Sequence, residues 1–189
     1  MKFIPVRVQY RHVHLSAADQ AVLFGLNAPR VLAEVSQRGQ QVYDQTVSIT
    51  GPEGARIDGV RVLGPAREKT QVELSASEAY ALGLDLPVRL SGDTVRTPGC
   101  VLAGPEGTIE LKEGTIIPAR HLHCSTEDAE ALGLKQYDTV SVVVVDRPQT
   151  VIDLVTVRVH PLYTLELHLT TDEAAEFWLQ TADRVILKT

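Results

Sequence analysis

Short stretches of alternating apolar and polar residues recur along the chain, and they predict a mainly β protein with short α-helices. Alternation or β-branched runs suit a pleated strand, and they occur at residues 3–10, 41–50, 55–63, 139–145, 151–159 and 185–187. Gly and Pro turns separate these stretches, and a short helix is predicted at residues 17–24. Many short strands with regular turns and only three or four short helices indicate β-barrels capped by helices.

One hexapeptide occurs twice. Arg11–Ser16 reads Arg-His-Val-His-Leu-Ser, and Arg120–Ser125 reads Arg-His-Leu-His-Cys-Ser. Residues i and i+2 of a strand point to the same face, so each copy places two imidazoles side by side. Neutral imidazoles on one rigid face make half of a metal site. A single such pair is more often a chance feature of a polar strand face, but four of the six histidines lie in the repeated frame.

The repeat extends into the following helices. Ser16 and Ser125 are each followed three residues later by an aspartate, which is the spacing of a helix cap. Residues 71–75 and 166–170 show the same layout more weakly, and in all four copies a potential ligand lies two residues before the cap. A strand that ends by presenting a ligand is thus predicted to lead into a short helix. The candidate metal ligands, enough for two ions, are His12, His14, Glu73, His121, His123 and His168.

Composition excludes several classes of protein. The 189-residue chain has a formal net charge of −6 and no long basic run, which argues against a nucleic-acid partner. Its two cysteines, Cys100 and Cys124, cannot form a disulfide framework, so a reducing interior is favoured over secretion. No signal-peptide or membrane-spanning stretch is visible, and we expect a cytoplasmic protein without a membrane partner.

Some reactive residues are predicted to be structural. Cys124 alternates with His123 and therefore faces away from it, so a small buried hydrophobe is the favoured interpretation. His160 lies outside the repeated frame and is expected to face solvent or to be hydrogen-bonded. Arg11 and Arg120 precede the paired histidines and should form structural ion pairs.

Two residues have stronger claims on a site. Glu166 shares a strand face with His168, so it either orients that ligand or is an ordinary exposed carboxylate. Arg67 lies six residues before Glu73, where a turn and a strand can hold it near the same site. The alternative for Arg67 is a solvated surface charge.

A Gly-Pro-Glu-Gly turn also occurs twice, at residues 51–54 and 104–107. A glycine-rich turn can cradle phosphate, but these two lack the Lys and Ser/Thr of a P-loop. We expect them to be structural turns in β units that are used more than once.

Four segments together resemble a known family. They are Arg11–Ser16, residues 62–73 (Val-Leu-Gly-Pro-Ala-Arg-Glu-Lys-Thr-Gln-Val-Glu), Arg120–Ser125 and residues 165–168 (Leu-Glu-Leu-His). In these motifs the chain resembles the PduL-type phosphotransacylases, also called phosphate propanoyltransferases, from about residue 5 to about residue 176. The resemblance implies two β-barrels capped by short helices, with a dinuclear metal site at their junction. It also implies that residues 1–10 and 119–189 form one discontinuous barrel and residues 11–118 the other.

The resemblance assigns roles to seven residues. It implies one zinc ion on His12, His14 and Glu73, a second on His121, His123 and His168, and Arg67 as the active-site arginine. Zinc is also favoured over cobalt or manganese by the histidine-rich ligands. Cys124 replaces a residue that is often Met in the family, and His160 stands where the family usually lacks His. Many members carry an N-terminal peptide that directs them into bacterial microcompartments. The metal motif here begins at residue 11, so we expect a free cytosolic enzyme or one recruited by another route.

The implied reaction converts acyl-CoA (propanoyl-CoA or acetyl-CoA) and phosphate into acyl phosphate and coenzyme A, reversibly. Direct attack by phosphate is favoured over an acyl-enzyme, because no cysteine is well placed as a nucleophile. We expect a homodimer. One alternative is a dinuclear metal-dependent hydrolase, since His-x-His strands also serve such enzymes. The other is a non-catalytic metal-binding module, in which the metal only stabilises the fold.

Overall fold

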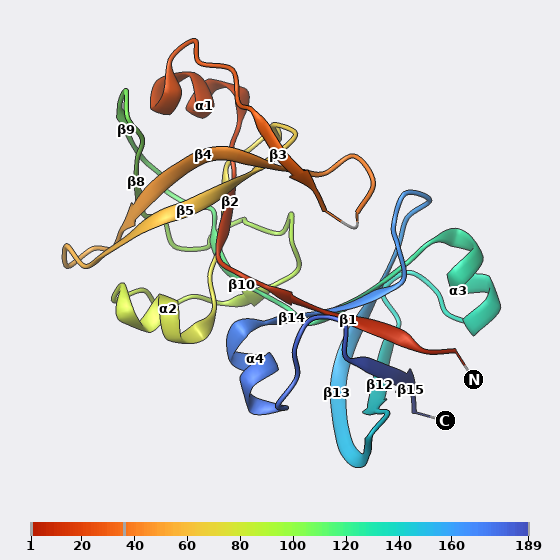
Figure 1. Ribbon diagram of the computed structural model, residues 1–189. Helices are drawn as coiled ribbons and strands as arrows, with labels where there is room; N and C mark the ends of the chain where they lie inside the picture. Colours follow the sequence, from red (N-terminus) through yellow and green to blue (C-terminus); the bar gives the residue numbers. More distant parts are fainter. Residues whose placement is uncertain (1, 36, 189) are drawn as a thin grey trace. The chain divides into compact units, whose positions relative to one another are not determined.

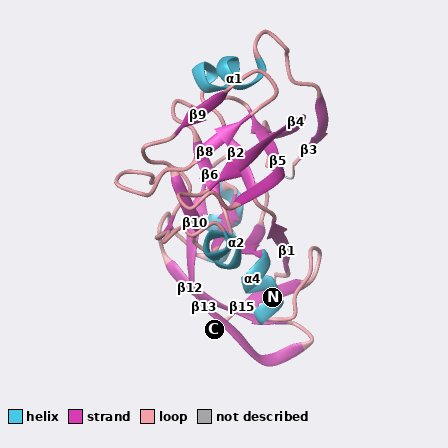
Figure 2. Ribbon diagram, turned by 90° about the vertical axis from the view of Figure 1, so that its left-hand side faces the viewer, coloured by secondary structure: helices cyan, strands magenta, loops and turns pink. Residues whose placement is uncertain are grey.

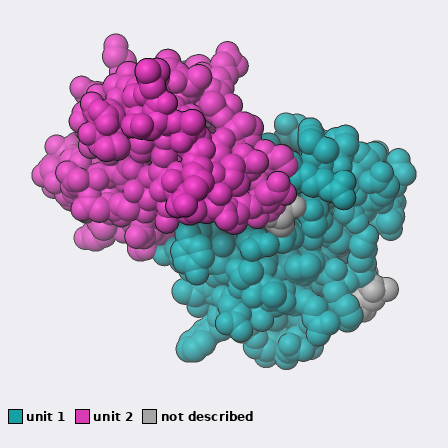
Figure 3. All heavy atoms as spheres, turned by 45° about the horizontal axis from the view of Figure 1, so that its top comes forward, with its two compact units in different colours: residues 1–10, 36–38, 119–189 teal, residues 11–35, 39–118 magenta. Residues whose placement is uncertain are grey.

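Strands dominate the protein, as the sequence pattern predicts. The computed structural model describes residues 2–35 and 37–188, and in this part of the chain four short helices accompany fifteen strands (Figures 1 and 2). The prediction of a mainly β fold with short helices is confirmed. Contacts divide the chain into two units, of residues 1–10, 36–38 and 119–189 (unit 1) and residues 11–35 and 39–118 (unit 2), which Figure 3 colours separately. No helix in the described residues is long and apolar enough to cross a membrane.

Unit 1 is a closed barrel. Its strands follow the order β1-β14-β11-β13-β12-β15, and β15 returns to pair with β1. They are β1 (Ile4–Gln9), β11 (His121–Cys124), β12 (Thr139–Val144), β13 (Arg147–Val159), β14 (Glu166–Thr170) and β15 (Arg184–Leu187), with helices α3 (Thr126–Leu132) and α4 (Thr171–Glu176). The first strand lies parallel to β14, so the start of the chain completes a barrel that is otherwise built from its last third.

Strand parity sorts the side chains of unit 1. Leu122 and Cys124 of β11 and Leu167 and Leu169 of β14 are buried in the barrel core. Because successive residues point to opposite faces, the alternate positions of the same strands carry the histidines. The apolar residues that close the barrel therefore also aim the candidate ligands.

Unit 2 is a half-barrel. Its strands are β2 (His12–His14), β3 (Val31–Glu34), β4 (Gln41–Thr50), β5 (Arg56–Gly64), β6 (Gln71–Glu73), β7 (Val88–Arg89), β8 (Val101–Ala103), β9 (Thr108–Glu110) and β10 (Thr115–Pro118), with helices α1 (Ala17–Phe24) and α2 (Ala76–Ala81). The order is β7-β10-β6-β2-β5-β4-β8-β9, with β3 beside β4. Among the described residues the path ends at β7 and β9. Unit 2 is therefore an open half-barrel, whereas a second barrel was expected.

All four helices begin at the predicted caps. The side chains of Ser16, Ser75, Ser125 and Thr170 each accept a hydrogen bond from the backbone N–H three residues later. A cap satisfies an amide that the first helical turn would otherwise leave unpaired. Each helix starts three residues after a candidate ligand, so the cap sets where the strand that carries this ligand ends.

The two Gly-Pro-Glu-Gly turns pack against helix ends. A Cβ on Gly51 would lie 1.8 Å from the carbonyl oxygen of Leu82, after α2, and one on Gly104 would lie 2.4 Å from that of Leu23 in α1. Real Cβ atoms do not approach so closely, so only glycine permits this packing. The contacts support the structural interpretation of both turns.

Candidate metal centres

The first triad consists of His12, His14 and Glu73, all in unit 2. Strand β2 carries the two histidines and lies antiparallel to β6, whose Glu73 is directly opposite His12. One ligand atom from each residue lies within 4.8 Å of the others, and all three side chains are buried. Nε2 of His12 lies 3.4 Å from Oε2 of Glu73.

The second triad consists of His121, His123 and His168, all in unit 1. Strand β11 lies antiparallel to β14, and His168 is directly opposite His121. The three ring centroids lie 4.5 to 4.9 Å apart, and one nitrogen of each ring lies within 4.8 Å of the others. The sequence-predicted ligands are thus brought together as two groups of three.

The triads are two copies of one construction. In each, a His-x-His strand has a parallel neighbour on one side (β5 or β13) and an antiparallel neighbour on the other, which supplies the third ligand. Arg11 donates to Glu78 at 2.8 Å, and Arg120 donates to Glu173, also at 2.8 Å. Both glutamates close the helix caps that follow the third ligand, so the predicted structural pairing of the two arginines is confirmed.

Burial keeps two of the candidate ligand histidines neutral. Desolvation lowers the pKa of His14 well below its usual value, and His12 and Arg67 lower it further. Desolvation likewise lowers the pKa of His123, and His121, His168, Arg158 and His160 add to that effect. A neutral imidazole offers a lone pair, which is the form that binds metal.

One further observation indicates that the second triad suits a metal ion. Both ring nitrogens of His123 are buried, and neither has a hydrogen-bond partner in the described part of the chain. A buried nitrogen without a partner is costly, unless something that the protein itself does not supply binds it. The Nδ1 of His121 lies 2.8 Å from the carbonyl oxygen of Ala119 and so carries the proton, which leaves Nε2 as the lone pair. Three histidine nitrogens are a donor set that suits zinc.

Arg67 lies against the first triad. Its Nη2 is 2.8 Å from Nε2 of His14, and its Nη1 donates to Oγ of Ser91 at 3.1 Å. Arginine has only donors, so the imidazole nitrogen accepts. The main-chain N–H of Arg67 also donates to the carbonyl oxygen of Leu15, which fixes the turn beside β2. The interpretation of Arg67 as a solvated surface charge is therefore wrong.

Sequence reasoning missed two polar residues beside Glu73. The amide of Gln71 donates to Oε1 of Glu73 at 2.5 Å and to Oγ of Ser91 at 2.9 Å, and its own oxygen accepts from the N–H of Gly92 at 2.8 Å. Gln71 thus holds the Glu73 carboxylate and the Ser91 loop together. Its position two residues before Glu73 on the same strand was a usable signal, whereas Ser91 lies in a loop without a motif.

The structure also shows the surroundings of Cys124, Glu166 and His160. Cys124 is fully buried in the unit 1 core, and burial raises the pKa of its thiol to about 11, which confirms the structural interpretation. Glu166 is 6% exposed and accepts from Arg7 at 3.1 Å, so it is not an exposed carboxylate. Its Oε2 lies 3.4 Å from Nε2 of His168, which suits a role in orienting that ring. His160 is exposed, and its Nδ1 accepts from the N–H of Leu162.

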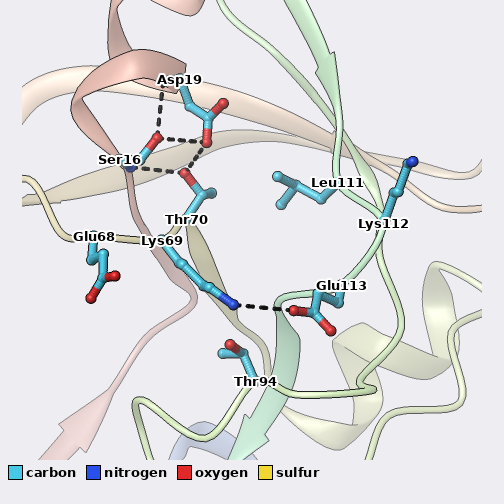
Figure 4. A pocket seen from close by; sticks show the side chains of 9 residues that line it. All are labelled: Ser16, Asp19, Glu68, Lys69, Thr70, Thr94, Leu111, Lys112 and Glu113. Atoms are coloured by element: carbon cyan, nitrogen blue, oxygen red, sulfur yellow. Dashed lines mark hydrogen bonds and ion pairs between the residues drawn. The ribbon is translucent and has the colours of Figure 1, made fainter.

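Unit 2 also has a surface hollow of about 260 Å³ that contains none of the candidate ligands (Figure 4). Asp19 accepts from the hydroxyls of Ser16 and Thr70 on one wall, and Lys69 pairs with Glu113 on another. These polar groups bind one another around the α1 cap.

The lowered pKa values predict how the metal-free protein responds to acid. Between the ordinary value of about 6.5 and the lowered values of His14 and His123, the unfolded chain binds more protons than the folded one. The free energy of unfolding should therefore fall as the pH drops below about 6.5, by up to about 1.4 kcal/mol per pH unit for each group. Thermal unfolding of chelator-treated protein between pH 7.5 and 5.5 measures this. The variant His14→Gln/His123→Gln should respond less, and an equal response in both proteins would refute the linkage.

Comparison with known proteins identifies the family of this chain. The family model of phosphate propanoyltransferase matches residues 5–180, which include both triads and Arg67. A phosphate propanoyltransferase of Thermotoga maritima is 45% identical over 186 residues, covering 97% of this chain and 88% of that protein. One of Klebsiella pneumoniae is 42% identical over 172 residues (90% and 81%), and one of Planctopirus limnophila is 42% identical over 184 residues (96% and 75%). The resemblance noted in the sequence is confirmed: the chain belongs to the phosphate propanoyltransferase family, and it is an enzyme of the acyltransferase class.

Proposed function

We propose that this protein transfers an acyl group between coenzyme A and phosphate, with propanoyl-CoA or acetyl-CoA as the thioester. In this proposal each triad holds one zinc ion. The observation that carries it is the duplicated construction of two buried triads with neutral histidines, in a chain of this family. The expected homodimer and the cytoplasmic location stay predictions.

When bound, the metal would act as a Lewis acid: it would polarise a carbonyl oxygen or bind an oxygen of the phosphate. The protein contributes the ligands and their orientation. Gln71 fixes the carboxylate of Glu73, and the cap of α2 fixes the end of the strand that carries it. Ligands that do not move on binding keep the two substrates in a reactive geometry, which removes part of the entropic barrier of a two-substrate reaction.

Arg67 is the residue that we propose to bind phosphate. Its guanidinium is always charged and donates in a planar fork that matches two phosphate oxygens. The contacts with Ser91 and His14 hold this fork at the edge of the first triad. Its charge also stabilises the negative charge that develops as the thioester carbonyl is attacked.

Direct attack by phosphate is the mechanism that we favour, because neither cysteine can serve as a nucleophile. A phosphate oxygen bonds to the carbonyl carbon, the C–S bond breaks, and CoA leaves as its thiolate. An acyl-enzyme would need a protein thiolate, but Cys100 and Cys124, which are the two cysteines of the chain, are both buried in hydrophobic cores. Burial raises the pKa of both thiols, so neither is ionised at neutral pH.

Release of CoA with and without phosphate tests the proposal against its two alternatives. The purified protein is given propanoyl-CoA or acetyl-CoA, and the free thiol is recorded continuously. A phosphate acyltransferase releases CoA only when phosphate is present. A dinuclear hydrolase releases it without phosphate, and a metal-binding module releases none, so either of these results would overturn the proposal. The ratio of the rates with propanoyl-CoA and with acetyl-CoA ranks the two acyl groups.

A further inference from the structure

Five of the six candidate ligands have a polar partner that fixes their orientation. His121 contacts the carbonyl oxygen of Ala119, His14 contacts Arg67, His12 contacts Glu73, Glu73 accepts from Gln71, and His168 contacts Gln37 at 3.2 Å. Such a contact sets the rotation of the ring, as when His121 donates to the carbonyl oxygen of Ala119 or His14 accepts from Arg67. In the described residues His123 lacks one on both nitrogens.

The ring of Tyr163 covers His123 instead. The two ring centroids lie 3.9 Å apart with an interplanar angle of 29°, so the rings are stacked. His160 lies on the tyrosine ring in turn, at 5.1 Å and 45°. Tyr163 is partly buried, in the loop between β13 and β14.

Backbone contacts fix this loop relative to His123. The N–H of His160 donates to the carbonyl oxygen of Cys124, the residue that follows His123, at 3.1 Å. The N–H of Tyr163 donates to the carbonyl oxygen of His160 at 2.9 Å, and the N–H of Leu162 donates to the His160 ring at 3.2 Å. The position of the tyrosine ring is thus set from the strand that carries the histidine.

Stacking holds an imidazole without using either nitrogen. The lone pair and the N–H of imidazole lie in the ring plane, whereas Tyr163 contacts its face. The ring can therefore be oriented while both in-plane directions stay available.

We propose that Tyr163 is the positioning residue of His123: its ring, in place of a hydrogen bond, fixes the imidazole in the orientation that binds metal. The inference rests on the proposed ligand role of His123, and it assigns the tyrosine ring, not its hydroxyl, as the active part. Loss of an outer partner of a metal-bound histidine typically lowers metal affinity 10- to 100-fold, and we expect a loss of about tenfold here.

Zinc affinity of the second triad is the measurement that tests this inference. The background variant His14→Ala impairs the first triad, so that a chelator competition titration of the metal-free protein reports the second. In this background Tyr163→Leu should weaken zinc binding about tenfold or more, whereas Tyr163→Phe, which keeps the ring, should bind within about twofold of the background protein. Tyr137→Leu is the matched control, because Tyr137 is an exposed tyrosine of the same unit, and it should leave the affinity unchanged.

The outcomes separate this inference from the proposed function. If the background protein binds zinc and Tyr163→Leu binds it equally well, the positioning role is wrong while the ligand role stands. If Tyr163→Phe is as weak as Tyr163→Leu, the hydroxyl acts and the stacking argument fails. If the background protein takes up no zinc, the ligand assignment fails and the inference fails with it. The melting temperature of each metal-free variant shows whether lost affinity reflects lost folding, and Tyr163→Trp, which retains a stacking ring, should then restore binding.

Discussion

Replacing His14 or His123 by alanine should each remove one zinc ion per chain and reduce acyl transfer nearly to background. Each triad has three ligands, and a site that loses one of three keeps too few donors to hold the ion tightly. Because the triads lie on different strand pairs, each variant should lose the ion of its own triad and keep the other. Elemental analysis of the purified proteins gives the zinc content, and the CoA-release assay gives the activity.

The matched control for these variants is His160→Gln. His160 is the histidine outside both triads, it is exposed, and glutamine keeps an acceptor for the N–H of Leu162. This variant should retain about two zinc ions per chain, one for each triad, and most of its activity. Full zinc occupancy in both alanine variants would show that the triads are not the metal sites.

Arg67→Ala should separate zinc binding from catalysis, because activity should fall while zinc affinity should not. Arg67 is a permanent cation 2.8 Å from a ring nitrogen of His14, so it repels a metal ion there just as it lowers the pKa of that histidine. Its removal should leave zinc affinity unchanged or higher. Activity should nevertheless fall about a hundredfold or more, as for the loss of one well-placed transition-state donor.

Arg67→Lys should restore little of this activity, because an ammonium group cannot make the two-pronged contact with phosphate oxygens. Arg56→Ala is a suitable control, since Arg56 is an exposed arginine of unit 2 that pairs with Asp58. Steady-state kinetics with phosphate as the varied substrate provide the comparison. Normal turnover in Arg67→Ala would remove this residue from the proposed site, and a large loss of zinc would make it a structural support of the triad.

The sequence predicted that the six candidate ligands lie together as two triads, because their arrangement depends on local rules. Residues i and i+2 of a strand share a face, so His121 and His123 had to lie together once β11 formed. The third ligand needed only an antiparallel neighbour of the correct register, and the helix caps marked where each such strand ends. The alternation of the strand and the helix cap that follows it can both be recognised within a segment of six to eight residues.

The parts that the sequence did not predict depend on contacts between distant segments. Whether a sheet closes depends on which strands meet at its two ends, and no local pattern states that β7 and β9 leave unit 2 open in the described residues. Ser91 reaches Arg67 and Gln71 only through the path of a loop. Tyr163 resembled any loop aromatic, because its partner His123 is forty residues earlier in the chain.

The central claim is that phosphate receives the acyl group and that this transfer requires zinc on each of the two triads. It is tested most directly by returning zinc in steps to the metal-free protein while phosphate-dependent CoA release is recorded. The account predicts no release from the metal-free protein and a rise to a plateau at about two zinc ions per chain, one for each triad. Full release from the metal-free protein, or release that is the same without phosphate, would contradict it.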